Sequence, residues 1–149
     1  MSEFFAALYE TLFRVYHASY PEIFSTLYNY GGYVKLGLIF LLVPLVFWLL
    51  FYFLWRYPYG RFWHWLLWWL LSGVVVLVVT WLQARGAIFD APNPALVDAL
   101  ADPESGYKVY AVTLPQRYAL INTGLSLVAG FLYSLLLKPF SKIQMHLPF

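Results

Sequence analysis

Acid–base chemistry is the first chemistry that the residue types of this chain would allow, because four carboxylates lie within one short stretch. They are Asp90, Asp98, Asp102 and Glu104. Two carboxylates in one site can divide the roles of general acid and general base between them. Pro103 is expected to end any helix that Asp98 and Asp102 share, because proline cannot continue its hydrogen bonding. We therefore interpret this stretch as a solvated acidic loop and predict no catalytic residue.

His64 is the second chemically suggestive position, because it lies between Trp63 and Trp65, with Trp68 one helical turn further on. A histidine there could act as a proton-responsive gate or contact a quinone or haem. Aromatic side chains also gather where a helix passes from lipid into water. We favour the latter interpretation, an interfacial aromatic belt. Its predicted members are Trp55, Trp63, His64, Trp65 and Trp68.

Several other kinds of site are excluded or unsupported by the sequence. The chain has no cysteine, which rules out disulfides, thiolate catalysis and Cys-based metal sites. It contains no zinc-protease, nucleophile-elbow, phosphate-loop or dinucleotide-binding motif. A net charge of +2 without a basic run does not indicate a nucleic acid partner. We predict that the protein is not an enzyme, and we expect no cofactor and no metal ligand.

A polar stripe in the last apolar segment is the most informative pattern. Asn122, Ser126, Gly130 and Ser134 recur every four residues and so share one side of a helix, which Thr123 widens. Small and weakly polar residues let two membrane helices approach closely and hydrogen-bond. We favour helix packing for this stripe, and the alternative is a water-filled pore lined by several copies. A shallower matching surface is expected from three residues of the preceding apolar segment: Ser72, Gly73 and Thr80.

Three uncharged segments must position these residues: 36–55, 62–84 and 118–137. Twenty helical residues reach about 30 Å, the thickness of the hydrocarbon core of a bilayer. Inside lipid, every backbone polar group must bond within its own segment, so each should be a helix. The composition agrees, because 62% of the residues are hydrophobic and only 11% are charged. The sequence therefore predicts an all-α integral membrane protein with three transmembrane helices.

The cations predict the orientation of these helices. The connection 56–61 and the tail 138–149 are short and contain no acidic residue, yet together they carry Arg56, Arg61, Lys138 and Lys142. Lys and Arg are concentrated in cytoplasmic loops of membrane proteins. We therefore expect a multi-pass protein of the cytoplasmic (inner) membrane with its N-terminus outside and its C-terminus in the cytoplasm. The N-terminus lacks the features of a secretory signal, so we expect it to be retained.

Segment 1–35 is predicted to lie outside, before the first span, and to begin with an amphipathic helix over residues 2–17. Apolar side chains recur there at three- and four-residue spacing. They are Phe5, Leu8, Tyr9, Leu12, Phe13 and Tyr16. We expect this helix to lie in the membrane interface with its aromatic side in lipid. The alternative is that this side docks on a protein.

The long connection 85–117 is predicted to form a small folded extracytoplasmic cap. Asn93 followed by Pro94 is typical of a helix start and predicts a short helix to about Leu100. Residues 107–112 alternate loosely and could be extended. Thr113 is expected to cap the third long helix before it enters the membrane.

These features together favour a non-enzymatic membrane anchor or scaffold subunit of a larger assembly. Partners are expected at the extracytoplasmic face or along the third span, besides the bilayer itself, and a homo-oligomer is compatible with the same pattern. The alternative function is a subunit of a homo-oligomeric pore lined by the polar stripe. An ion-coupled transporter is disfavoured, because no Asp, Glu, Lys or Arg lies within the three spans.

Overall fold

The computed structural model describes residues 1–55 and 62–141, and over these residues every regular element is a helix. Three of the helices are long and apolar enough to span a membrane, which confirms the all-helical prediction with three candidate spans. The elements are α1 (Ser2–Ala7), η1 (Leu8–Leu12), α2 (Pro21–Asn29), α3 (Gly32–Leu49), η2 (Leu50–Leu54), α4 (Phe62–Phe89), α5 (Pro94–Ala101), α6 (Tyr107–Leu137) and η3 (Lys138–Phe140).

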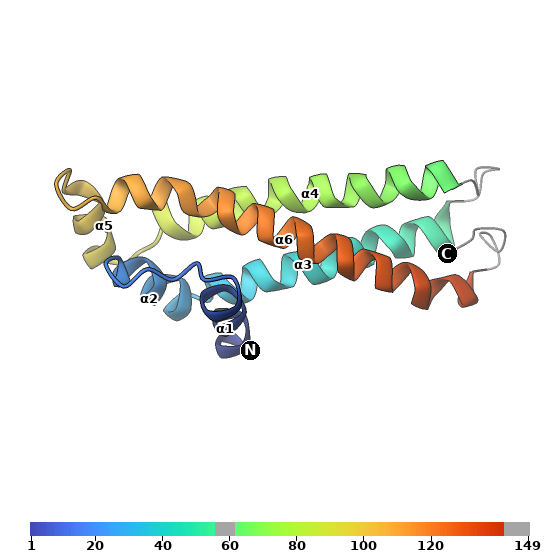
Figure 1. Cartoon of the computed structure of the whole chain (residues 1–149), viewed down its shortest axis with the longest axis horizontal. Helices are drawn as coiled ribbons and strands as arrows, with labels where there is room; N and C mark the ends of the chain where they lie inside the picture. Colours follow the sequence, from blue (N-terminus) through green and yellow to red (C-terminus); the bar gives the residue numbers. More distant parts are fainter. Residues whose placement is uncertain (56–61, 142–149) are drawn as a thin grey trace.

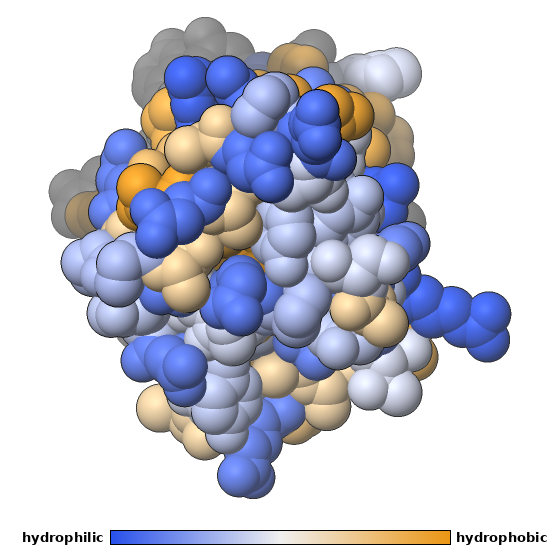
Figure 2. Space-filling model, turned by 90° about the vertical axis from the view of Figure 1, so that its left-hand side faces the viewer, coloured by the Kyte–Doolittle hydropathy of each residue, from blue (hydrophilic) through white to orange (hydrophobic). Residues whose placement is uncertain are grey.

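The three long helices α3, α4 and α6 form an elongated bundle in which α6 packs along both of the others (Figure 1). Helix α3 ends, α4 begins and α6 ends at the same end of this bundle. The opposite end is covered by the short helices α2 and α5. Figure 2 shows that end of the molecule, where hydrophilic residues cover most of the visible surface.

Both α4 and α6 are longer than the uncharged segments that predicted them. Helix α4 continues through Arg85 to Phe89, and α6 begins at Tyr107, so residues 107–112 are helical and not extended. The left-handed Gly106, with φ +72°, precedes α6. Ala111, Leu114 and later Tyr118 then place one side of the helix in the core. This tertiary burial stabilises helix where the local sequence suggested an extended segment.

The N-terminal segment differs from the expected helix over residues 2–17. Helical structure ends with the π-helical turn η1 at Leu12, and Arg14 has a positive φ of 50°. Phe5 and Tyr9 are buried against the bundle, whereas Leu12 is 68% exposed. The chain turns away at Arg14 so that Val15 can also reach the core. The aromatic side of the first helix thus contacts the chain's own helices.

Close approach of this segment depends on Gly37 in α3. A Cβ added to Gly37 would overlap the ring of Phe5. The absent side chain therefore forms the space into which Phe5 packs. The outward side of the segment stays exposed and apolar, with Phe4 66% exposed.

The two short helices at the capped end are joined by Asn93. Its side-chain oxygen accepts a hydrogen bond from the Ala95 backbone N–H at 3.2 Å, which caps α5 as the Asn-Pro pair indicated. Its side-chain nitrogen donates to Thr26 Oγ1 in α2 at 2.6 Å. We call this end of the molecule the platform. It consists of α2, α5, the end of α4 after Arg85 and the beginning of α6 before Arg117.

Candidate functional site

The polar stripe of α6 lies inside the bundle of a single copy. Asn122, Ser126, Gly130 and Ser134 are buried, and Thr123 is half-buried. On α4, the predicted matching surface is also buried at all three of its positions: Ser72, Gly73 and Thr80. A Cβ on Gly73 would lie 3.0 Å from the Leu127 side chain, so the two helices meet closely there.

Asn122 is the centre of a buried hydrogen-bond network that joins four parts of the chain. Its side-chain oxygen accepts a hydrogen bond from the Tyr9 hydroxyl at 2.6 Å. Its side-chain nitrogen donates to the Leu36 carbonyl at 2.9 Å and to Thr80 Oγ1 at 3.1 Å. One amide on α6 thereby holds η1, α3 and α4. Buried amides are costly unless they are bonded in this way, and once bonded they specify one arrangement of the helices.

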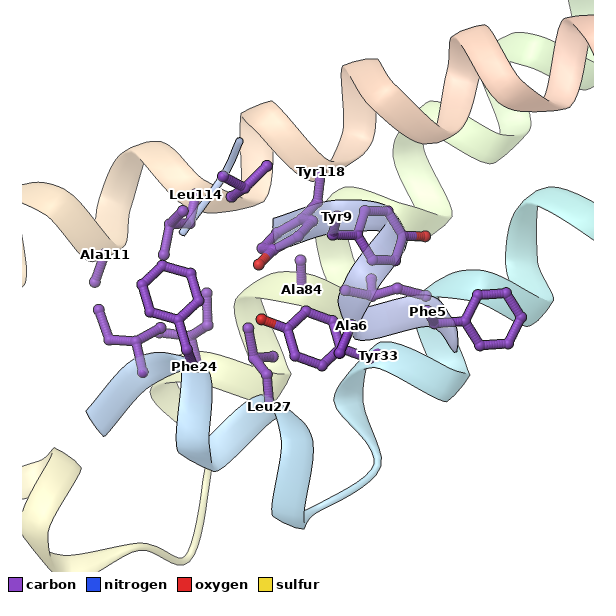
Figure 3. Close-up of a cluster of buried hydrophobic side chains, with 14 of the residues drawn as sticks. Phe5, Ala6, Tyr9, Phe24, Leu27, Tyr33, Ala84, Ala111, Leu114 and Tyr118 are labelled. Carbon is purple, nitrogen blue, oxygen red and sulfur yellow. The ribbon is translucent and has the colours of Figure 1, made fainter. Parts of the chain in front are cut away.

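Tyr9 also belongs to the buried hydrophobic cluster of the bundle, where it lies beside Tyr33 and Tyr118 (Figure 3). Its ring stacks on Tyr33 with a centroid distance of 5.9 Å and meets Tyr118 edge-on at 5.3 Å. The Tyr33 hydroxyl donates to the Glu10 carboxylate. Together with the stacking of Tyr9 on Tyr33, this hydrogen bond links η1 to α3. Burial raises the pKa of the Tyr9 phenol above its ordinary value, so the hydroxyl stays protonated and available to donate.

The other end of the stripe is held by a second cluster around Ser134. The Ser134 hydroxyl bonds to the Tyr52 hydroxyl and accepts from the Trp65 indole N–H, each at 2.7 Å. Ser141 donates to the Tyr52 carbonyl at 2.7 Å, which fastens the end of α6 to η2. Trp48 is fully buried beside them, and it stacks on Tyr52 with a centroid distance of 5.7 Å.

Gly130 marks the closest approach of α6 to Trp48. A Cβ on Gly130 would lie 2.8 Å from Trp48 Nε1, 3.5 Å from Trp69 and 3.6 Å from Pro44. Trp69 itself donates its indole N–H to the Leu127 carbonyl at 2.8 Å. Two tryptophans therefore pack over the small side of α6 and fill the space that a larger residue would need.

The predicted aromatic belt divides into exposed and packed members. Trp55 and Trp63 are exposed, and His64 is half-buried. Trp65 differs from the expectation, because its ring is only 4% exposed and lies in the Ser134 cluster. Trp68 is half-buried and donates to the Phe47 carbonyl at 2.7 Å, just before the π-helical turn η2. Trp65 shares a helix side with Trp69 and Ser72, and that side faces the bundle.

The charged residues singled out by the sequence are placed as follows. Lys138 begins η3, whereas Arg56, Arg61 and Lys142 lie outside the described residues. The four acidic residues of the connection are all exposed, and Asp102 accepts the Glu104 backbone N–H in a turn at 2.9 Å. Among the described residues, no three His, Asp or Glu side chains are grouped as metal ligands would be.

The sequence pattern identifies the stripe but misses two of its partners. It assigns Tyr9 to a lipid-facing side and gives Tyr52 no role. The local sequence around a tyrosine in an amphipathic helix does not show whether its side chain will face lipid or will bond to a buried amide far along the chain. Comparison with protein-family models, with curated proteins and with solved structures gave no significant match.

Proposed function

We propose that this chain is a non-enzymatic membrane anchor or scaffold subunit, whose bundle holds the platform in a fixed position for protein partners. The supporting observation is the Asn122 network. The polar groups of the stripe are used within one copy, where they join the N-terminal segment and all three long helices. Polar side chains that are hydrogen-bonded within one copy stabilise the bundle, and few of their donors and acceptors remain for water in a pore. This arrangement thus favours an anchor over a pore lined by the same residues.

The platform has the mixed surface that protein contacts use. Val97 on α5 is 50% exposed and Val109 on α6 is 76% exposed. Exposed acidic residues accompany them, including Asp98 next to Val97. Apolar side chains surrounded by charged ones are typical of an interaction surface outside the membrane.

We further propose that the platform faces the outside of the cytoplasmic membrane. The support is the sequence distribution of Arg56, Arg61, Lys138 and Lys142, which fall in the connection between the first two spans and in the tail after the third. Helix lengths fit this arrangement. The 31 residues of α6 extend about 46 Å, which exceeds the hydrocarbon core by about 16 Å and raises the platform into the headgroups and water.

Site-specific photocrosslinking in native membranes tests the anchor role. A photoreactive residue at Val97 or Val109 should capture the same protein partner, and this protein should also copurify in a fixed ratio. The matched control is Leu132, which is 52% exposed on α6 and should capture lipid. Val97→Lys should reduce copurification without changing membrane insertion.

The pore alternative makes the opposite prediction. If the platform positions capture only copies of this chain, and the purified protein conducts ions in liposomes, the anchor proposal is wrong. Loss of that conductance on substituting Ser126 or Ser134 would assign the flux to the stripe.

A further inference from the structure

A cavity of about 700 Å³ lies between the end of α4 and the beginning of α6. Its wall combines an apolar part with three polar side chains. Arg85 and Asp90 come from α4 and the turn after it, and Gln116 comes from α6. The apolar part includes Trp81 and Leu82, and Leu82 is 57% exposed on the outer surface of the bundle. The cavity thus joins a polar region to an apolar helix surface.

If the three long helices cross a bilayer, helix length puts this cavity at the level of the phospholipid headgroups. Twenty residues of α4 counted from Phe62 end at Trp81, and twenty residues of α6 counted back from Leu137 end at Tyr118. Each stretch spans about 30 Å, the hydrocarbon thickness. Arg85 lies four residues beyond the first limit and Gln116 two residues beyond the second, so a bilayer that covers these stretches would put both side chains at the level of its phosphate groups.

The cation in this cavity, Arg85, stacks on an aromatic ring and has no ion pair with any of the described residues. The Arg85 guanidinium lies over the Trp81 ring, 5.6 Å from its centroid. Such stacking orients a guanidinium while leaving its N–H donors free for a phosphate, which they match in geometry. Within residues 1–55 and 62–141 no ion pair involves Arg85.

The anion lies close by, on the same helix end. The Asp90 backbone N–H donates to the Gly86 carbonyl at 3.0 Å, and the Asp90 carboxylate folds back over Gly86. It lies 3.5 Å from the position that a Cβ on Gly86 would take, so the missing side chain keeps this part of the cavity open. No described residue forms an ion pair with Asp90.

We propose that this cavity binds a phospholipid whose headgroup carries both a phosphate and a primary ammonium, as in phosphatidylethanolamine. Arg85 and Gln116 bind the phosphate, Asp90 accepts the ammonium, and the acyl chains run down the apolar surface at Leu82. A single anionic headgroup would leave Asp90 opposed to negative charge, whereas a zwitterion satisfies both side chains. This site is independent of the proposed anchor role and would stand without a protein partner.

Native mass spectrometry of the purified, delipidated protein with added lipid tests this assignment. Phosphatidylethanolamine should be retained more strongly than phosphatidylglycerol or phosphatidylcholine, because only its headgroup has phosphate and N–H donors together. Arg85→Gln and Asp90→Asn should each weaken its binding roughly tenfold, the effect of losing one charge-assisted hydrogen bond. For phosphatidylglycerol, Asp90→Asn should not weaken binding.

Two matched controls keep the test specific. Arg117→Gln removes a similar cation, which stacks on Tyr110 outside the cavity wall, and Asp98→Asn removes a similar acid. Both should leave retention unchanged. Gly86→Leu keeps every charge but places a bulky side chain in the cavity wall beside Asp90, and it should reduce the preference for phosphatidylethanolamine. Far-ultraviolet circular dichroism should show that each variant remains helical.

Three results would overturn the proposal. The first is equal retention of the three lipids by the unaltered protein. The second is the same loss of binding in Arg117→Gln as in Arg85→Gln. The third is competition by glycerophosphoethanolamine at the same concentration as the lipid, because this compound has the headgroup but no acyl chains and would identify a soluble zwitterion as the ligand.

Discussion

At the scale of single residues, the Asn122 side chain joins four separate parts of the chain through buried hydrogen bonds. Its amide uses one acceptor and two donor positions, and each contacts a different element. The hydrogen bond from Tyr9 links residues that are 113 positions apart in the sequence. Asn122 therefore couples the docking of the N-terminal segment to the packing of the three long helices.

We predict that Asn122→Leu lowers the free energy of unfolding by about 2 kcal/mol. It removes three hydrogen bonds, and such bonds within membrane bundles average about 0.6 kcal/mol each. The Tyr9 hydroxyl would also lose its buried partner, which adds to the cost. Unfolding in mixed detergent micelles, followed by circular dichroism, would measure the change.

Thr123→Val is the matched control for Asn122→Leu. Thr123 is half-buried, and among the described residues its hydroxyl bonds only to the Ala119 carbonyl of its own helix, at 2.8 Å. Its replacement should alter the free energy of unfolding by less than about 0.5 kcal/mol. Equal effects of the two substitutions would show that the Asn122 network does not contribute specifically to stability.

At the scale of elements, the small side of α6 decides how closely α3 and α4 can approach. Gly130 lies against Trp48 and Trp69, whereas a Cβ added to Gly124, on the same helix, would meet no atom of the described residues within 4 Å. Both glycines lie within α6, but Gly130 is tightly packed and Gly124 has open space beside it. The exposed residues of α6, such as Leu132, cover its other side.

We predict that Gly130→Leu destabilises the bundle by about 1–3 kcal/mol, because the new side chain would overlap the buried Trp48 indole. Gly124→Leu should be neutral or slightly stabilising, since leucine favours helix over glycine by several tenths of a kcal/mol or more. Unfolding in detergent and the near-ultraviolet signal of the tryptophans would measure both variants. A Gly130→Leu protein with unchanged stability and unchanged tryptophan signal would contradict this packing.

At the scale of the whole molecule, the two ends of the bundle differ. One end carries the polar platform, and at the other end α3 ends, α4 begins and α6 ends. The platform gathers α2 and α5 at one end, while Lys138 lies at the other. An odd number of candidate spans places the two termini on opposite sides if all three cross the membrane. The absence of cysteine makes this arrangement directly measurable with single-cysteine variants.

We predict that a membrane-impermeant maleimide labels Asp98→Cys in intact cells and labels Lys138→Cys only after the membrane is opened. Asp98 is exposed on the platform, and Lys138 begins the segment after α6. The charge distribution that favours a cytoplasmic C-terminus is the physical reason. Labelling in the reverse order would invert the proposed orientation. Labelling of both cysteines in intact cells would contradict three crossings.

The number of long helices and the composition of the polar stripe follow from the amino-acid sequence without any knowledge of the fold. A helix needs about twenty uncharged residues to cross the hydrocarbon core of a bilayer. Residues that recur every four positions lie on the same side of a helix. The start of α5 could also be predicted from the sequence, because the Asn93 cap is a local interaction. These features depend on residues that are close in sequence.

What covers each side of a helix became known from the three-dimensional fold. It placed Tyr9 on Asn122 and turned Trp65 into the core, where the sequence suggested the membrane interface for both. It also began α6 at Tyr107, because burial of Leu114 and Tyr118 stabilises helix there. The physical reason is that helical periodicity tells which side chains share a face. Whether that face meets lipid or a distant tyrosine depends on contacts between residues far apart in the chain.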